Sequence, residues 1–136
     1  MTAQIFVDAV AWIAILNTRD SLHQTSVSTL GDLRQRNSKL ITSEFVLLEV
    51  ANALSSPDFR ARVAVFIDGL RQYDYVEIVE ASSELFSAGM ALYRGRPDKS
   101  WSLVDCTSFA VMTERRISSA LTEDRHFEQA GFAKLL

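Results

Sequence analysis

The sequence predicts an α/β protein built around a parallel sheet with helices on both faces. Short apolar runs of strand length alternate with longer segments of helical periodicity, and no repeat, linker or low-complexity segment interrupts them. The 136 residues suit one domain, and a composition that is 48% hydrophobic and 23% charged is that of a folded globular chain. We therefore expect residues 1–136 to form a single domain.

Five short segments have the character of strands. The first is an apolar run that ends in an acid, which is typical of a buried strand. The third alternates with period two. The expected strands are residues 4–8, 39–42, 75–80, 118–123 and, as a candidate last strand, 132–136.

Helical segments separate these strands, and several begin with a recognisable signal. Asp8 is a candidate N-cap of the first helix, Ser43 caps the third, and Pro57 begins the fourth. Apolar residues in the fourth recur at steps of four and three from Phe59 to Tyr73, which makes one apolar face. The expected helices are residues 9–17, 21–37, 43–56, 57–73, 82–95 and 102–116, with a turn or short helix over 124–131.

The charge balance restricts the partners of this protein. Its formal net charge is −3, which is not the basic footprint usual for a nucleic-acid-binding protein. A phosphate polymer would need a cation or a local basic patch to offset that acidity. Eleven of the fourteen basic residues are Arg, a side chain suited to bidentate phosphate contact.

Cysteine usage and the N-terminus indicate the compartment. Cys106 is the only cysteine, so no internal disulfide forms, which fits a reducing cytoplasm. Its apolar helical turn, without a neighbouring histidine, favours a small buried thiol over a nucleophile. Residues 1–16 lack a positively charged leader, and Asp8 interrupts their apolar run. We therefore expect neither a signal peptide nor a membrane span.

Four carboxylates are placed to meet at one edge of the predicted sheet. Asp8 ends the first strand and Asp124 follows the fourth, and sites in such sheets form outside the carboxyl ends of the strands. Glu49 lies in the second turn of the helix after the second strand. Asp105 opens the helix that leads into the fourth strand.

Each acid also has a structural interpretation. Asp8 is a candidate N-cap, Ser102 and Asp105 fit a capping box, and Asp124 lies in a polar turn. Glu49 is harder to explain in this way, because apolar residues surround it on nearly all sides. A charge there must be paired, bound to a metal or on the outer face of the helix.

Joint placement of the four acids predicts a metal. Like charges that lie close together raise one another's pKa unless a cation neutralises them. Oxygen ligands without His or Cys select a hard ion, Mg²⁺ or Mn²⁺. Such an ion makes a water acidic enough to attack a phosphodiester, and it also offsets the net negative charge.

Four segments then resemble a known family. They are FVDAVAWIAIL, TSEFVLLEVANAL, SLVDCTSFAVM and ALTEDRHFEQAGF. In this order they resemble the four acidic motifs of PIN domains, and most of all those of the VapC-type toxin ribonucleases of prokaryotic toxin–antitoxin pairs. The resemblance covers residues 4–136, and DKSWSLVDCTSF and TEDRHFEQAGF are its most characteristic parts.

This resemblance implies a three-layer α/β/α fold and Mg²⁺- or Mn²⁺-dependent cleavage of single-stranded RNA that leaves a 5′-phosphate. By motif position, Asp8 and Asp105 would be the core metal ligands. Glu49 and Asp124 would complete the metal site, or hold and deprotonate the water. The resemblance also implies a homodimer, and inhibition by a cognate antitoxin protein whose C-terminal segment blocks the site.

One position departs from the family pattern. Many members have Thr or Ser where this chain has Ala9, so a hydroxyl that could support a ligand or a water is missing. Ser102 and Thr122 are the remaining supporting hydroxyls, although a cap or a turn also explains each. Ala9 leaves open an inactive PIN-like protein that works as a protein-binding module, against which the four retained acids argue.

Other function classes find less support. A receiver-type signalling domain needs an acidic pair at its first strand, and a DxD phosphatase needs a second Asp two residues after the first; both are absent here. The five glycines are scattered and form no nucleotide-binding loop.

Basic and aromatic residues near the motifs are candidates for RNA contact. Solvated charge also explains each basic residue and His126, and Asp98 is expected to be a solvated loop acid. Trp12 is expected in the core, whereas Trp101 suits the core and base stacking about equally. His23 and His126 show no recognisable metal-ligand spacing. The RNA-binding candidates are Arg94, Arg96, Lys99, Arg125 and Trp101.

Overall fold

The computed structural model describes residues 2–136 and contains one five-stranded sheet in the order β3-β2-β1-β4-β5. Every neighbouring pair of strands is parallel. The strands are β1 (Gln4–Val7), β2 (Lys39–Ser43), β3 (Val76–Val79), β4 (Ser119–Leu121) and β5 (Ala133–Lys134). All five expected strands are present, which confirms the predicted parallel sheet.

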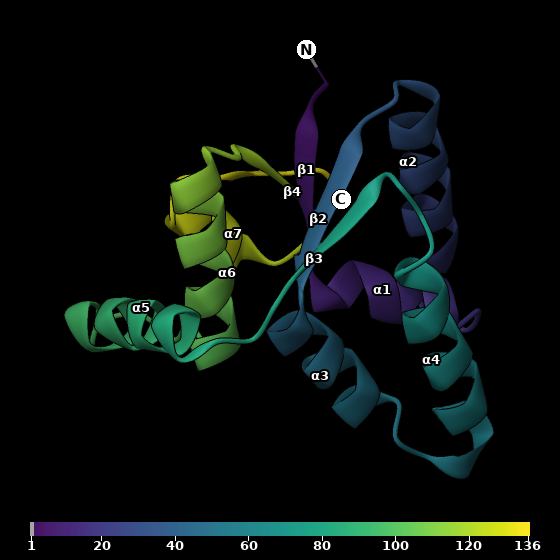
Figure 1. The fold of residues 1–136 in the computed structure, drawn as a ribbon, viewed down its shortest axis with the longest axis horizontal. Coiled ribbons are helices and arrows are strands. Elements are labelled where there is room, and N and C mark those ends of the chain that lie inside the picture. Colours follow the sequence, from purple (N-terminus) through teal and green to yellow (C-terminus); the bar gives the residue numbers. More distant parts are fainter. Residues whose placement is uncertain (1) are drawn as a thin grey trace.

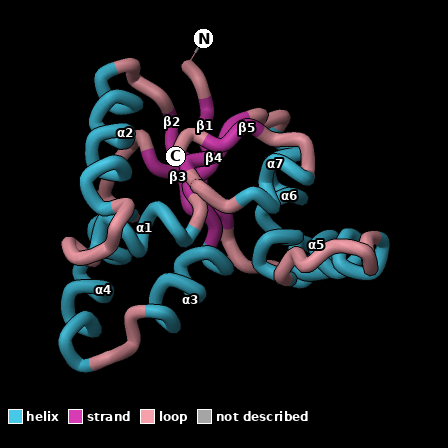
Figure 2. Tube along the Cα trace, turned by 180° about the vertical axis from the view of Figure 1, so that it is seen from behind, coloured by secondary structure: helices cyan, strands magenta, loops and turns pink. Residues whose placement is uncertain are grey.

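Helices cover both faces of the sheet (Figure 1). The helices are α1 (Ala9–Leu16), α2 (His23–Gln35), α3 (Glu44–Ala53), α4 (Pro57–Leu70), α5 (Ser83–Gly95), α6 (Leu103–Arg115) and α7 (Arg125–Gln129). Helices α1, α2 and α4 lie on one side, α5, α6 and α7 lie on the other, and α3 begins below the ends of the strands (Figures 1 and 2). The three-layer α/β/α architecture is therefore confirmed.

The core fills both interfaces between sheet and helices. Phe6 of β1 is fully buried, and Trp12 of α1 packs edge-on against Phe66 of α4 at 5.3 Å between ring centroids. The Trp12 indole N–H donates to the hydroxyl of Thr42, which donates to the Val7 carbonyl. The prediction that Trp12 is a core residue is confirmed.

Local signals explain where most helices begin. The Ser43 hydroxyl accepts a hydrogen bond from the Val46 N–H at 3.1 Å, and Pro57 is the first residue of α4, both as predicted. Helix α2 is shorter than the predicted residues 21–37, because the Asp20 carboxylate accepts from the Leu22 N–H and forms a turn ahead of it.

Strand β3 differs from its predicted pattern. Its four residues are all half-buried and do not alternate between buried and exposed. It is an edge strand that pairs only with β2, so one of its long sides has no neighbouring strand.

Helices α5 and α6 approach each other closely at Gly89. A Cβ placed on Gly89 would lie 2.6 Å from Cγ2 of Thr107 and 3.2 Å from the Thr107 backbone nitrogen. Only a residue without a side chain fits there. The contact joins α5 to α6, the helix that carries Asp105.

Within residues 2–136 no helix combines the length and apolar character needed to cross a membrane.

Candidate active site

Asp8 lies at the carboxyl end of β1, at the N-cap position of α1, but its side chain does not cap the helix. The backbone carbonyl of Asp8 accepts hydrogen bonds from Ala11 and Trp12, whereas the side chain makes no capping hydrogen bond. Its Oδ2 instead accepts a 2.9 Å hydrogen bond from the hydroxyl of Thr122, just past β4. Asp8 is therefore the N-cap residue of α1, as predicted, but it caps the helix through its backbone alone. Its carboxylate, only 3% exposed, lies at the carboxyl edge of the sheet.

Thr122 connects two of the four acids. While its hydroxyl donates to Asp8, it accepts from the backbone N–H of Asp124 at 3.0 Å. The Asp124 carboxylate then caps α7, since its Oδ1 accepts from the His126 N–H at 2.9 Å. Strands β1 and β4 are parallel neighbours, so Asp8 and Asp124 are brought to the same edge, as the strand-end rule predicts.

Asp105 and Ser102 form the predicted capping box at the start of α6. The Ser102 hydroxyl accepts from the Asp105 N–H at 3.0 Å, and Asp105 Oδ2 accepts from the Ser102 N–H at 3.1 Å. The same Oδ2 lies 3.1 Å from Nδ1 of His126, and that nitrogen lies 3.4 Å from Oδ1 of Asp124. The Asp105 carboxylate therefore both caps α6 and contacts another residue of the candidate site.

Glu49 projects from α3 and is half-buried. Its pKa is raised, first by burial and then by the negative charges of Asp105 and Asp124. The apolar enclosure expected around it is incomplete, because the neighbouring Leu48 is 59% exposed. The negative charges of Asp105 and Asp124 nevertheless act on Glu49, so it interacts electrostatically with the other acids of the site.

The acids shift one another's ionisation. Burial raises the pKa of Asp8 to about 7, the Thr122 hydroxyl opposes that rise, and the charges of Asp105 and Glu49 add to it. The pKa of Asp105 is also raised by burial, against the hydrogen bonds from Ser102 and His126. A cluster of this kind favours either bound protons or a bound cation.

The donor atoms fit a divalent cation. Asp8 is buried, and within residues 2–136 it forms no ion pair with a basic side chain. One ligand atom each from Asp105, Asp124 and His126 lies within 4.8 Å of the others. Carboxylate oxygens with one imidazole nitrogen are ligands that divalent ions accept. We conclude that the residues at this edge are suited to hold a metal.

His126 was not selected from the sequence. Its interpretation as a solvated charge is wrong, because its ring is largely buried and its Nδ1 contacts two carboxylates. In the sequence, only its position two residues after Asp124 indicated that His126 lies near the site. Its contact with Asp105, 21 residues away, is visible only in the folded structure.

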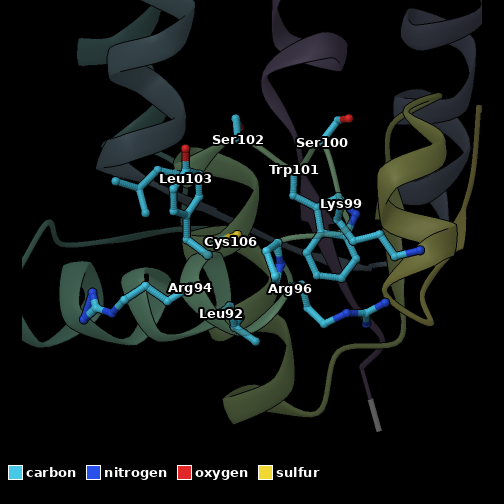
Figure 3. Close-up of a pocket in the computed structure, with 11 residues that line it drawn as sticks. Leu92, Arg94, Arg96, Lys99, Ser100, Trp101, Ser102, Leu103 and Cys106 are labelled. Carbon is cyan, nitrogen blue, oxygen red and sulfur yellow. The ribbon is translucent and has the colours of Figure 1, made fainter.

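A cavity of about 780 Å³ lies between the end of α5 and the start of α6 (Figure 3). Arg94, Arg96 and Lys99 line it, together with Ser102 of the capping box. Arg96 pairs with the exposed Asp98 through two 3.1 Å hydrogen bonds, and Lys99 Nζ lies 3.9 Å from the same carboxylate. Arg94 forms no ion pair in the described part of the chain, and Arg125 is exposed on α7.

Trp101 belongs to the core. It is 7% exposed, its indole N–H donates to Oε1 of Gln129, and its ring packs edge-on against Phe109 at 5.0 Å. These contacts hold the ring in place, which argues against stacking on an RNA base. Cys106 is fully buried and burial raises its pKa, so the expectation of a buried thiol is confirmed.

The fold and the acid cluster define a class of α/β protein with a carboxylate-rich site at the carboxyl edge of a parallel sheet. Comparison with protein families identifies that class, because the model of the PIN domain matches residues 5–133. The chain belongs to the PIN domain family, as the four motifs predicted.

Comparisons of sequence and of structure both match VapC20 over nearly all of the chain. The 23S rRNA-specific endonuclease VapC20 of Mycobacterium tuberculosis is 29% identical over 131 residues, 96% of this chain and 97% of that protein. The crystal structure of VapC20, described as a sarcin–ricin loop cleaving toxin, has a TM-score of 0.85 at 28% identity and covers 96% of this chain and 98% of that one.

A more distant structure shares the fold. VapBC2 from Rickettsia felis, solved with a fragment of its promoter DNA, has a TM-score of 0.67 at 12% identity and covers 97% of each chain.

Proposed function

We propose that this protein is a metal-dependent endoribonuclease that cleaves single-stranded RNA and acts as the toxin of a toxin–antitoxin pair. The observation that supports the proposal is the electrostatic coupling of Asp8, Glu49, Asp105 and Asp124: burial raises the pKa of the first three, and the charges of neighbouring acids add to the rise. Support for RNA as the substrate comes from VapC20, named as a 23S rRNA-specific endonuclease and similar over nearly the full length.

Each acid has a proposed role. Asp8 and Asp105, the more deeply buried acids, would be the core ligands of Mg²⁺ or Mn²⁺. Glu49 and Asp124 are more accessible and would complete the site or hold the attacking water. Thr122 would orient Asp8 through its hydroxyl, and Ser102 would orient Asp105 through its backbone N–H.

The reaction is hydrolysis of a phosphodiester. A divalent ion in this site would neutralise charge on the phosphate and make a water more acidic. A carboxylate, Glu49 or Asp124, takes a proton from the water as its oxygen bonds to phosphorus. The bond from phosphorus to the 3′-oxygen then breaks, and that oxygen takes up a proton. The products are a 3′-hydroxyl and a 5′-phosphate.

RNA would approach along the basic side of the site. Arg94, Arg96 and Lys99 line a cavity that shares Ser102 with the Asp105 capping box, and Arg125 lies on α7 beside Asp124. These cations offset the net charge of −3 locally and would contact phosphates on either side of the cleaved bond.

The proposed partners follow the family. A cognate antitoxin would inhibit the enzyme by covering the acid site, and two copies of the chain would form a homodimer in the cytoplasm. Co-purification from cells that express the adjacent reading frame would test the antitoxin, and light scattering of the isolated chain would test the dimer.

Cleavage of a defined RNA set tests the activity. The set contains single-stranded and structured RNAs together with 23S rRNA, and each is incubated with Mg²⁺, Mn²⁺ or EDTA. We expect cleavage with either ion, none with EDTA, and none with Asp105→Asn, a variant whose amide oxygen can still accept from the Ser102 N–H.

Asp98→Asn is the matched control, because it makes the same change at an exposed loop acid. It should retain activity. If the wild-type chain folds, binds neither ion by calorimetry and cuts no RNA, the enzyme proposal fails and the alternative of an inactive binding module replaces it.

A further inference from the structure

The imidazole ring of His126 contacts two of the four acids, although the sequence predicted a metal site made of carboxylates alone. Its Nδ1 is 3.1 Å from Asp105 Oδ2 and 3.4 Å from Asp124 Oδ1. The lone pairs of an imidazole nitrogen and of carboxylate oxygens repel one another at these distances. Either a hydrogen on the nitrogen, donated to the carboxylates, or a metal ion bound to all three atoms removes that repulsion.

The spacing of these atoms matches a shared metal. Neighbouring ligands of an octahedral ion with bonds of about 2.1 Å lie about 3.0 Å apart. Both nitrogen–oxygen distances, 3.1 and 3.4 Å, are near that value, whereas the limit of 4.8 Å for the whole group leaves the two carboxylate oxygens to move closer when an ion binds. A neutral ring with its hydrogen on Nε2 presents a lone pair at Nδ1 toward this point.

A separate observation also indicates a cation here. Asp8 is only 3% exposed, its carboxylate accepts a hydrogen bond from the Thr122 hydroxyl, and no basic side chain of residues 2–136 pairs with it. A buried carboxylate is stabilised by a positive charge, and His126 contacts Asp105 and Asp124 but makes no hydrogen bond with Asp8.

We infer that His126 is a nitrogen ligand of the metal site, so that the site takes a transition ion such as Mn²⁺ in preference to Mg²⁺. Imidazole is a softer ligand than carboxylate and suits transition ions, whereas Mg²⁺ prefers oxygen alone. This inference rests on the proposed metal site and specifies which ion it selects. The proposed donor set adds one nitrogen to the carboxylate oxygens expected from the sequence.

Pulsed electron paramagnetic resonance of bound Mn²⁺ tests the inference, because it detects a directly coordinated ¹⁴N. The chain contains only His23 and His126, so protein without a polyhistidine tag gives an unambiguous result. His23 bonds to the Ala14 carbonyl in α1, away from the acids, and His23→Asn is the matched control. We expect the nitrogen signal in wild-type protein and in His23→Asn, and its loss in His126→Asn.

Calorimetry with Mn²⁺ and Mg²⁺ provides the second readout. An Asn side chain places an amide N–H near the position of Nδ1, so His126→Asn retains a hydrogen bond to the carboxylates but not the imidazole. We expect the preference for Mn²⁺ over Mg²⁺ to fall at least about tenfold in His126→Asn and to be unchanged in His23→Asn.

The outcomes separate the two proposals. Mn²⁺ that binds wild-type protein with no nitrogen signal would overturn the role of His126 and leave the carboxylate site standing. An unchanged Mn²⁺ preference in His126→Asn would assign His126 to hydrogen bonding alone. Folded wild-type protein that binds no Mn²⁺ would overturn both this inference and the proposed enzyme. The wild-type spectrum decides the question even where the His126 variant does not fold.

Discussion

The hydroxyl of Thr122 donates a 2.9 Å hydrogen bond to Asp8, which lies 114 residues earlier in the chain. The same hydroxyl accepts from the Asp124 N–H, so one side chain fixes the carboxylate after β1 and the backbone after β4. Ala9 supplies no hydroxyl beside Asp8, so we propose that Thr122 is the hydroxyl that supports this carboxylate.

Thr122→Val should therefore impair the site more than its small change in volume suggests. The variant leaves Asp8 without its hydroxyl donor, and we expect metal affinity and cleavage rate to fall about 10–100-fold. Unfolding in denaturant should show a loss of about 1–3 kcal/mol. Thr122→Ser retains the hydroxyl and should stay close to wild type; equal damage from both variants would argue against this role.

Asp8→Asn should stabilise the metal-free fold while it abolishes cleavage. Burial raises the Asp8 pKa from 3.8 to about 7, so between those values the folded chain binds more protons than the unfolded one. Stability therefore falls as pH rises from about 4 to 7, by on the order of 4 kcal/mol at most, and levels off above. In EDTA the variant should show a flatter pH profile and a higher Tm at pH 8.

Asp98→Asn is the control for that profile. The Arg96 guanidinium lowers the pKa of this exposed carboxyl. Its contribution to folding stability therefore has the opposite sign to that of Asp8: it is present above the ordinary pKa of Asp and is lost as the pH falls. We expect little change in stability from it. A lower stability of Asp8→Asn than wild type at pH 8 in EDTA would contradict the assigned cost of the buried charge.

Metal binding should depend on pH in the direction set by the same acids. Burial raises the pKa of Asp8, Glu49 and Asp105, and protons must leave these groups before they ligate an ion. Mn²⁺ should therefore bind more weakly at pH 6 than at pH 8. Thermal unfolding at a fixed ion concentration measures this, with a stabilisation of about 2.7 kcal/mol expected at 100 times Kd. An equal shift of Tm at both pH values would exclude proton release from this site.

Gly89→Ala should destabilise the contact between α5 and α6. The added methyl would meet Cγ2 of Thr107 at 2.6 Å, and the Thr107 backbone is close enough to limit relaxation. We expect a loss of about 1–3 kcal/mol in denaturant unfolding. Gly31→Ala in α2 is the control, since no atom lies within 4 Å of the new methyl, and it should stabilise by up to about 1 kcal/mol. Similar effects of both would mean that the α5–α6 contact is not tight.

Arg94→Glu should weaken RNA binding without altering the acid site. Arg94 lines the cavity beside the capping box and has no ion pair within residues 2–136, so reversing its charge removes one cation from the RNA path. We expect KM to rise about tenfold at low salt, with a smaller change in kcat, and the salt dependence of KM to decrease. Arg19→Glu, an exposed residue after α1, makes the same change in net charge and should have little effect.

The elements of the fold follow from local signals in the chain. Ser43 and Pro57 begin helices where they were expected to, and the apolar run before Asp8 forms β1. These predictions succeed because capping and burial of short apolar runs depend on residues a few positions apart. Element ends are less predictable: α2 begins at His23, since the Asp20 turn competes with the helix.

The sequence by itself determined the parallel α/β class, through the alternation of strand-like and helical segments, and the family, through the four motifs in order. It also predicted the common edge of Asp8 and Asp124, because the carboxyl ends of parallel strands meet at one edge of a sheet. Only the tertiary structure decided that His126 meets Asp105, that Trp101 contacts Gln129 and Phe109, and that Thr122 donates a hydrogen bond to Asp8. Each of these contacts joins separate elements, and its distance depends on how helices pack on the sheet rather than on spacing along the chain.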